Sequence, residues 1–220
     1  MELRDSELYE LHFREKERRS NARFAIAIFL VFIMLLFFRI WWTGSFGGVI
    51  VDGNSMNVTL YDGEKLLMRY VGDDVQAKRG DIIVVHVGKY KEQYSSVTGE
   101  YLIKRLIAIE GDKVRCTDGK LEICYAGTVE WKILDEPYAY YGVNDRYKTS
   151  YDFKDVYEVG KGEIFFLGDN RSGPGTSVDS RFQENDKMSH LDKLYKVEDI
   201  YGIVPSWALE NHKILEKIFF

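Results

Sequence analysis

The apolar residues of this chain are concentrated in one long run near the N-terminus. Residues 24–38 are apolar without interruption, and with Ala22 and residues 40–42 the run reaches the roughly 20 residues that a helix needs to cross a bilayer core. Arg39 interrupts the run, but near a helix end its guanidinium can reach the lipid headgroups. The pattern therefore predicts a transmembrane helix over residues 22–42.

A cleavable signal sequence is the competing interpretation of this run. A polar leader of some twenty residues precedes it, and no small-x-small cleavage site follows Trp42. Both observations favour an anchor that stays attached to the mature protein.

The charges on either side of the predicted anchor indicate its orientation. Residues 43–48 carry no charge, whereas the N-terminal side is basic, with Arg14, Lys16, Arg18, Arg19 and Arg23. Basic residues flanking a membrane helix stay on the cytoplasmic side. We expect residues 1–21 to form a cytoplasmic leader and residues 43–220 an extracytoplasmic domain at the cell membrane.

Beyond the anchor the hydrophobic pattern is typical of β-strands. The apolar runs are short and are separated by Gly-Asp, Asp-Gly and Lys-Gly pairs. They occupy residues 49–51, 64–71, 81–87, 101–109 and 162–167. The sequence Thr117-Asp118-Gly119-Lys120 predicts a tight hairpin. Helical periodicity is suggested after residue 43 only at 187–200, so a mainly β domain is expected.

Composition and charge exclude several classes of function. The net charge is −5, and the exported part has no basic stripe, which argues against nucleic acid binding. No phosphate-binding loop is present. The histidines lack metal-ligand spacing, so no metal and no cofactor is expected; they are His12, His86, His190 and His212.

Cys116 and Cys124 are the only cysteines, and export would allow them to pair. A turn at Asp118-Gly119 places Cys116 opposite Leu121, however, and leaves Cys124 three residues along the strand. A longer turn would relieve this mismatch. Both a disulfide and two buried thiols remain open.

Ser55 and Lys104 are the candidate catalytic residues. In a strand over residues 101–109, Lys104 shares a face with Leu102, Leu106 and Ala108. Desolvation there would lower the pKa of the lysine toward neutrality, and a neutral amine can take the proton of a serine hydroxyl. Taken singly, Ser55 is more often a turn residue and Lys104 an edge charge.

Four separated segments resemble the type I signal peptidases, membrane-bound serine proteases with a Ser/Lys dyad. Residues 53–60 (GNSMNVTL) resemble the nucleophile box, and residues 79–85 (RGDIIVV) the next strand. Residues 104–114 (KRLIAIEGDKV) resemble the general-base box. Residues 167–171 (LGDNR), followed by 177–181 (SVDSR), resemble the last box. The resemblance covers residues 22–182 and extends to 202–205.

The chain departs from the family pattern at two places. Asn54 and Val58 stand where the family often has proline, which predicts a softer nucleophile loop. Residues 172–176 lengthen the turn in the last box, between the LGDNR segment and Ser177.

The resemblance implies the fold and the roles of the site residues. It implies a twisted antiparallel β-sheet with a catalytic core next to the membrane and a smaller β subdomain inserted at residues 115–160. Ser55 would be the nucleophile and Lys104 the general base. The Ser55 N–H would bind the oxyanion, whereas Gly53 stands where some relatives supply a second, serine donor. Ser177 would orient Lys104, with Asp179 and Arg181 supporting it.

The implied substrates are the signal peptides of exported precursors. Val49, Ile50 and Val51 form an edge strand suited to an extended peptide, and Met56 completes the predicted substrate-binding set. A pilin-processing enzyme or pilin-assembly chaperone on the same scaffold is an alternative, but a chaperone would not need both dyad residues. A self-cleaving Ser/Lys repressor would carry a DNA-binding domain where this chain has its predicted anchor. Besides precursors, membrane lipid is the expected partner.

Overall fold

The computed structural model describes residues 5–72, 75–88, 100–146, 148, 152–172 and 195–220. The chain forms two compact units, residues Met1–Ser45 and Phe46–Phe220. Each is described by itself.

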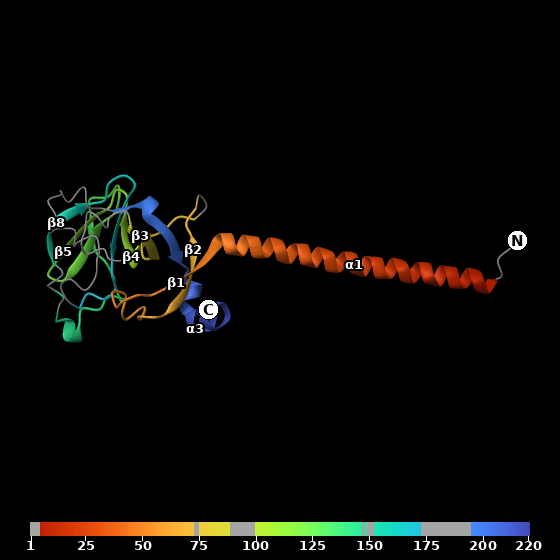
Figure 1. Ribbon diagram of the computed structural model, residues 1–220. Coiled ribbons are helices and arrows are strands. Elements are labelled where there is room, and N and C mark those ends of the chain that lie inside the picture. Colours follow the sequence, from red (N-terminus) through yellow and green to blue (C-terminus); the bar gives the residue numbers. More distant parts are fainter. Residues whose placement is uncertain (1–4, 73–74, 89–99, 147, 149–151, 173–194) are drawn as a thin grey trace. The chain divides into compact units, whose positions relative to one another are not determined.

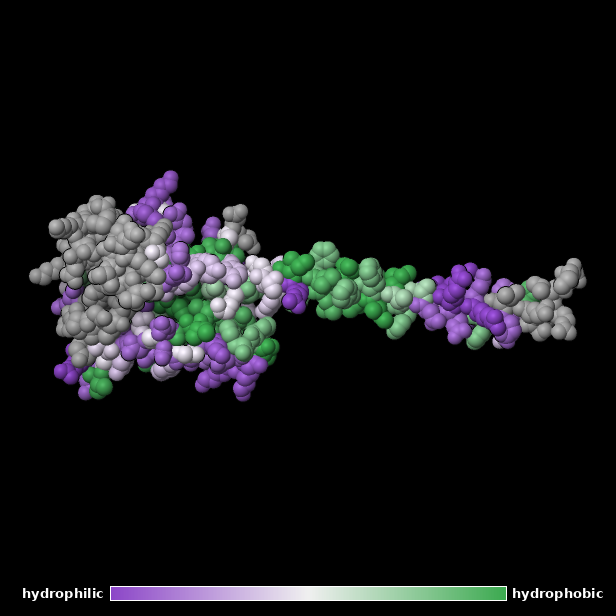
Figure 2. All heavy atoms as spheres, viewed as in Figure 1, coloured by the Kyte–Doolittle hydropathy of each residue, from purple (hydrophilic) through white to green (hydrophobic). Residues whose placement is uncertain are grey.

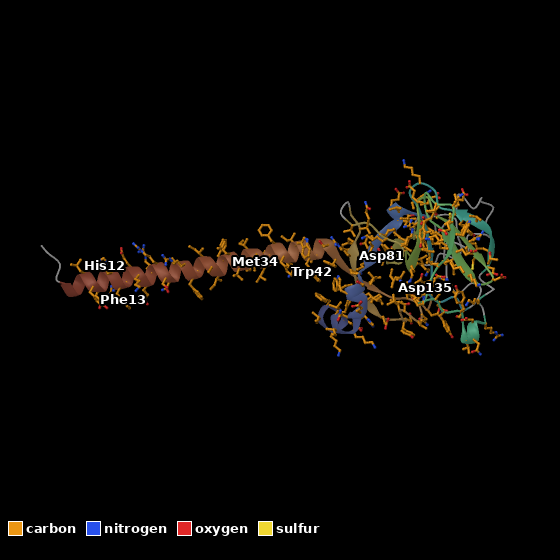
Figure 3. All side chains as sticks on the ribbon, turned by 180° about the vertical axis from the view of Figure 1, so that it is seen from behind. His12, Phe13, Met34, Trp42, Asp81 and Asp135 are labelled. Carbon is orange, nitrogen blue, oxygen red and sulfur yellow. The ribbon has the colours of Figure 1, made fainter. Side chains whose placement is uncertain are left out.

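The first unit is the helix α1, Asp5–Ser45. The predicted anchor over residues 22–42 lies inside α1, which is long and apolar enough to cross a membrane. Its apolar side chains, Met34 among them, project outward and are not buried by protein (Figure 3). Apolar residues form a continuous band, and polar residues gather toward the N-terminus (Figure 2).

The second unit is built on a seven-stranded antiparallel sheet (Figure 1). Its strands in spatial order are β1 (Phe46–Ile50), β2 (Lys65–Tyr70), β11 (Ile200–Val204), β3 (Ile82–His86), β4 (Tyr101–Ile109), β9 (Glu163–Leu167) and β10 (Tyr195–Lys196). The prediction of a mainly β, antiparallel fold is confirmed.

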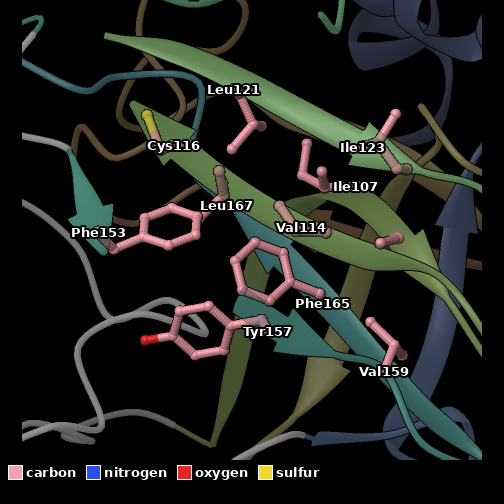
Figure 4. Packing of buried hydrophobic residues seen from close by; sticks show 11 residues of the cluster. Ile107, Val114, Cys116, Leu121, Ile123, Phe153, Tyr157, Val159, Phe165 and Leu167 are labelled. Atoms are coloured by element: carbon pink, nitrogen blue, oxygen red, sulfur yellow. The ribbon is translucent and has the colours of Figure 1, made fainter. Parts of the chain in front are cut away.

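A second, four-stranded sheet is formed by the chain between β4 and β9. Its order is β7 (Trp131–Ile133), β6 (Lys120–Cys124), β5 (Lys113–Thr117) and β8 (Phe153–Glu158). Buried side chains from both sheets pack together, with Phe165 of β9 against Phe153 and Tyr157 of β8 (Figure 4). The two sheets therefore share a hydrophobic core.

The hairpin between β5 and β6 turns at Asp118 and Gly119, both with positive φ. The register pairs Cys116 with Leu121 and Lys113 with Cys124, as the turn sequence predicted. Both cysteines are buried free thiols, because their positions along the two strands do not face each other.

Three expectations about secondary structure are wrong. Helical periodicity was suggested after residue 43 only at 187–200, but residues Ser206–Glu210 and His212–Phe219 form helices. Residues 195–200 form β10, a 3₁₀ turn (Val197–Asp199) and the start of β11 rather than a helix, and residues 187–194 lie outside the described residues. Strict alternation along β4 also fails. A register shift between Leu106 and Ala108 sends these two side chains into different core clusters.

Two short helices, α2 (Ser206–Glu210) and α3 (His212–Phe219), follow β11 and pack on β2. Glycines in β1 make room for their neighbours. A Cβ on Gly47 would lie 2.4 Å from Tyr70 Oη, and a Cβ on Gly48 would lie 2.6 Å from the Phe220 ring. Side chains at these positions would displace the aromatic rings that cover the start of the sheet.

Candidate active site

The structure brings Ser55 and Lys104 into direct contact. Ser55 lies in the loop between β1 and β2, and Lys104 lies in β4. The Lys104 amine donates a hydrogen bond to Ser55 Oγ at 2.7 Å and another to the Ile103 carbonyl at 3.2 Å. Lys104 is only 2% exposed. A buried amine thus sits within proton-transfer distance of a partly exposed hydroxyl.

Lys104 lies in the part of β4 that pairs with β3 but not with β9. β3 pairs with β4 along residues 101–105, with Ile83 opposite Lys104. β9 pairs with β4 only from Arg105 onward. Among the described strands, residues 101–104 therefore pair on one side only, and the loop bearing Ser55 approaches this opening.

The Ser55 loop is held by hydrogen bonds to three successive residues. Gly53 has φ +86°, and its N–H donates to Asp62 Oδ1 at 2.7 Å. Asn170 Nδ2 donates to the Asn54 carbonyl at 2.8 Å, and the Asn170 N–H donates to the Ser55 carbonyl at 2.9 Å. These contacts constrain a loop that was expected to be soft for lack of prolines.

A buried ion pair joins this loop to the strand that carries Lys104. Asp169 is completely buried and accepts hydrogen bonds from Arg105 Nε at 2.8 Å and Nη2 at 2.6 Å. The same carboxylate accepts a hydrogen bond from Thr59 Oγ1 at 2.5 Å. Arg105 also stacks on Tyr138, with its guanidinium carbon 3.9 Å from the ring centroid. Residues adjacent to Lys104 and close to Ser55 are thereby fixed to one another.

A second buried pair supports the segment that follows Asp169. The Arg171 guanidinium is 2% exposed and pairs with both carboxylate oxygens of Glu136 and with Tyr141 Oη, the last at 2.7 Å. Burial lowers the pKa of Arg171, but the hydrogen bonds and charge of Glu136 outweigh it and raise that pKa overall. Arg171 therefore stays charged and holds the segment carrying Asn170 in place.

The predicted substrate-binding residues differ in exposure. Val51 and Met56 are 4% and 1% exposed and belong to the core beneath the Ser55 loop. Val49 is partly buried against the same core, whereas Ile50 is 58% exposed at the end of β1. β1 is one of the two outer strands of its sheet among the described strands, the other being β10. Ser177, Asp179 and Arg181 lie outside the described residues.

Several positioning residues were not identified from the sequence. The Gly168-Asp169-Asn170-Arg171 motif was noted, but no role was assigned to its members. Arg105 follows Lys104 in the general-base box, and the strand pattern gave no indication of its ionic partner. Nothing in the sequence indicated that Asp62 would bind the Gly53 N–H. Each of these contacts joins segments that only the folded chain brings together.

The described site places a serine hydroxyl beside a buried amine that can accept its proton. Within the described ranges, no group of three His, Cys, Asp or Glu side chains is placed to hold a metal ion. The pairing of Ser55 with a buried amine, on a mainly antiparallel β scaffold, is typical of serine peptidases that use lysine as the base.

Comparison with known proteins identifies the family. The model of the family "Signal peptidase, peptidase S26" matches residues 22–206, and the chain belongs to this family of serine peptidases. It is 33% identical to signal peptidase I of Bacillus licheniformis over 173 residues, which cover 75% of this chain and 80% of that protein. It is 31% identical to signal peptidase I P of Bacillus subtilis subsp. natto over 181 residues, covering 76% and 83%.

A solved structure is also similar. The crystal structure of a signal peptidase I from Enterococcus faecalis aligns with 60% of this chain and 98% of its own, at 22% identity and a TM-score of 0.39. The assignment to the signal peptidase family depends on the sequence matches.

Proposed function

We propose that this protein removes N-terminal signal peptides from exported precursors, with Ser55 as nucleophile and Lys104 as general base. The observation that carries the proposal is the 2.7 Å contact between Lys104 Nζ and Ser55 Oγ, made by a lysine that is 2% exposed. Membership of the signal peptidase family supports the substrate class.

The proposed reaction begins with proton transfer from Ser55. Neutral Lys104 takes the hydroxyl proton as Ser55 Oγ attacks the carbonyl carbon of the scissile peptide bond. The C–N bond of the resulting tetrahedral intermediate then breaks, and Lys104 gives the proton to the departing amine. Water, deprotonated by the same amine, attacks the acyl-enzyme ester and releases the signal peptide with a free carboxylate. Ser55 regains its proton.

The oxyanion of the tetrahedral intermediate needs a fixed donor. The Ser55 N–H makes no hydrogen bond within the described part of the chain, so it is the donor we propose. The Gly53 N–H is already bound to Asp62 and is not proposed for this role. Ser177 is proposed, from the family resemblance, to orient Lys104, with Asp179 and Arg181 supporting it.

Two strand edges suit an extended substrate. β1 is an outer strand of the sheet, and residues 101–104 of β4 pair on one side only within the described strands. A peptide that hydrogen-bonds to either edge gains affinity from the backbone, while shallow apolar pockets select small side chains. We propose Val49 and Ile50 as contacts for the residues that precede the cleavage site, with Val51 and Met56 supporting them from the core.

Substitution of the dyad tests the proposal. Ser55→Ala and Lys104→Ala should each abolish cleavage of a purified precursor, because neither group acts alone. Ser206→Ala and Lys120→Ala change the same residue types at exposed positions and should leave turnover unchanged. The melting temperature in detergent shows whether each variant is folded. Near-normal turnover by either dyad variant would exclude the assigned mechanism.

The precursor class is tested with the same preparation. General secretory precursors and pilin precursors are incubated separately with the enzyme, and the new N-termini are sequenced. The proposed general role requires cleavage of the secretory precursors after small residues. Cleavage of pilin precursors alone would support the dedicated alternative.

The proposed topology has residues 22–42 spanning the membrane with residues 1–21 in the cytoplasm. The basic residues before the span support this orientation. Protease added outside wall-stripped cells should degrade the part beyond residue 43 and spare an epitope at residue 2. Loss of that epitope in intact cells would reverse the orientation.

A further inference from the structure

One face of the outer strand β1 is covered by the residue that follows α3. Residues 48 and 50 lie on the face of β1 opposite Val49, which packs against the core beneath the Ser55 loop. A Cβ on Gly48 would lie 2.6 Å from the Phe220 ring, so the ring lies directly over β1 at this position. Figure 1 shows α3 beside β1 and β2. Glycine therefore allows an aromatic side chain to reach the outer strand of the sheet.

The Phe220 ring is held over β1 by a lysine of β2. Lys65 pairs with Ile50 across the two strands, and its amine lies 5.7 Å from the centroid of the Phe220 ring. A cation above an aromatic face at this distance is attracted to it. The same amine lies 4.0 Å from Glu216 Oε1 in α3. The lysine and the glutamate together therefore add no net charge beside the ring.

Phe220 and Ile50 form an apolar surface that extends to the edge of the sheet. Phe220 is 48% exposed, and Ile50 is 58% exposed. Leu67, opposite Gly48 in β2, is 4% exposed, so burial on this face ends at β1. Within the described strands, β1 pairs with β2 alone. Two half-exposed apolar side chains thus lie beside the edge at which the signal peptide is proposed to bind.

A peptide that pairs with β1 alternates its side chains between the two faces of the sheet. Signal peptides carry small residues at the first and third positions before the cleavage site, which suit shallow pockets on the core face. The second and fourth residues then point to the face of Ile50 and Phe220. The peptide runs back from Ser55 along β1, and Ile50 comes before Gly48 in that direction. Ile50 therefore meets the second residue, and the Phe220 ring over Gly48 meets the fourth.

We infer that Phe220, next to Ile50, forms a binding site for an apolar side chain at the fourth position before the cleavage site. The inference rests on the proposed function, because it requires a signal peptide bound along β1. Phe220 does not touch the reacting atoms. Its contact is the same in the ground state and the transition state, so it lowers KM and leaves kcat unchanged. The site favours precursors whose signal peptide is apolar at this position.

Peptides that differ at a single position test the inference. One pair of soluble peptides carries Leu or Ser at the fourth position before the cleavage site, and a second pair carries the same two residues at the fifth. The full chain and its variants Phe220→Ala and Phe220→Leu cleave them in detergent. Phe219→Ala is the matched control, since Phe219 is the same residue type, adjacent in the chain and 45% exposed. Melting temperatures show whether each variant is folded.

The expected result is a preference for Leu at the fourth position that depends on Phe220. The parent should have a KM about three- to tenfold lower for Leu than for Ser, because a half-open contact discriminates less than a closed pocket. Phe220→Ala should bring this ratio close to one, whereas Phe220→Leu and Phe219→Ala should keep it. At the fifth position all four enzymes should give the same ratio. A ratio that survives Phe220→Ala, or that depends on Phe220 only at the fifth position, would overturn the inference.

Displacement of the ring supplies a second measurement. Gly48→Ala places a methyl group where the Phe220 ring lies and should reduce the preference for Leu as Phe220→Ala does. The two effects should not add in the double variant, because both act on the same ring. Additive losses would show that the ring does not make this contact and would count against the inference.

A binding assay separates failure of this inference from failure of the proposed function. Ser55→Ala cannot form the acyl-enzyme, so the Kd of fluorescent forms of the four peptides is measured on this variant, with and without Phe220→Ala. The preference for Leu at the fourth position should appear in Kd. Peptides that bind with this preference but are never cleaved by the parent would refute the proposed function and leave the Phe220 site standing. Equal Kd for Leu and Ser, with cleavage intact, would refute the Phe220 site alone.

Discussion

Asp169 connects the loop that carries Ser55 to β4, the strand that carries Lys104. Removal of its negative charge tests that connection. Its carboxylate is completely buried and binds Arg105 through two hydrogen bonds and Thr59 through a third. The substitution Asp169→Asn nearly preserves the shape of the side chain. It leaves the guanidinium of Arg105, whose side chain is 11% exposed, without its counter-ion. We expect a loss of both stability and activity.

The expected loss of stability follows from the burial of the pair. Breaking a buried ion pair by removing one partner costs about 3–5 kcal/mol. Arg105 keeps its hydrogen bond to the Gly80 carbonyl at 2.7 Å and its stacking on Tyr138, so we expect the lower end, about 3 kcal/mol. For a domain the size of Phe46–Phe220, that corresponds to a decrease in melting temperature of about 6–12 °C.

The activity should fall more than the stability alone explains. The Asp169 carboxylate accepts a hydrogen bond from Thr59 in the loop that carries Ser55. Asn170, the next residue in the chain, donates its N–H to the Ser55 carbonyl. A small displacement of Ser55 from Lys104 costs about tenfold to a hundredfold in kcat/KM, since proton transfer requires close alignment. The assay is peptide cleavage in detergent at a temperature where the variant is folded, together with melting followed by circular dichroism.

Two control variants show whether the loss of stability comes from the burial of the Arg105–Asp169 pair or from the loss of any ion pair. Glu158→Gln breaks the exposed pair with Lys113 in the four-stranded sheet and should not shift the melting temperature measurably. The double variant Arg105→Met/Asp169→Asn should be less destabilised than the sum of the single variants, since it leaves no unpaired charge. Additive effects, or a decrease below about 2 °C for Asp169→Asn, would refute the reasoning.

Two further predictions concern other side chains. Asp62→Ala should reduce kcat severalfold, because the Ser55 loop loses the hydrogen bond from the Gly53 N–H. Asp62→Asn retains an acceptor for this N–H and should keep most of the parent kcat. Equal losses of kcat in the two variants would assign another role to Asp62. The hydrogen bond from Arg115 lowers the pKa of Glu122 below its ordinary value, so the folded state binds fewer protons than the unfolded state between the two pKa values. The contribution of Glu122 to stability is therefore present above its unfolded pKa of about 4.3 and disappears as the pH falls through its folded pKa. Melting temperatures of the parent and Glu122→Gln should differ slightly at pH 7, less so at high salt, and converge near pH 3; a constant difference would contradict this assignment.

The sequence alone determined the features that depend on local pattern. The apolar run predicted the anchor-like segment within α1, because only length and composition are needed for a membrane helix. Gly-Asp, Asp-Gly and Lys-Gly pairs between short apolar runs predicted the mainly β domain. Asp118-Gly119 predicted that Cys116 lies opposite Leu121, whereas the structure decided that Cys116 and Cys124 are free thiols. The motifs around Ser55 and Lys104 marked both residues of the proposed dyad.

Tertiary structure decided the contacts between segments far apart in the chain. The sequence could mark Ser55 and Lys104 singly, but their 2.7 Å contact depends on the loop after β1 reaching residues 101–104 of β4, which pair on one side only among the described strands. The register shift after Leu106 depends on how β9 pairs with β4, which no local pattern specifies. Arg105 found its ionic partner 64 residues away in the chain. Hydrophobic periodicity reports which residues are buried, whereas the partner of a buried charge is set by chain topology, so such pairs emerge only once the strands have assembled.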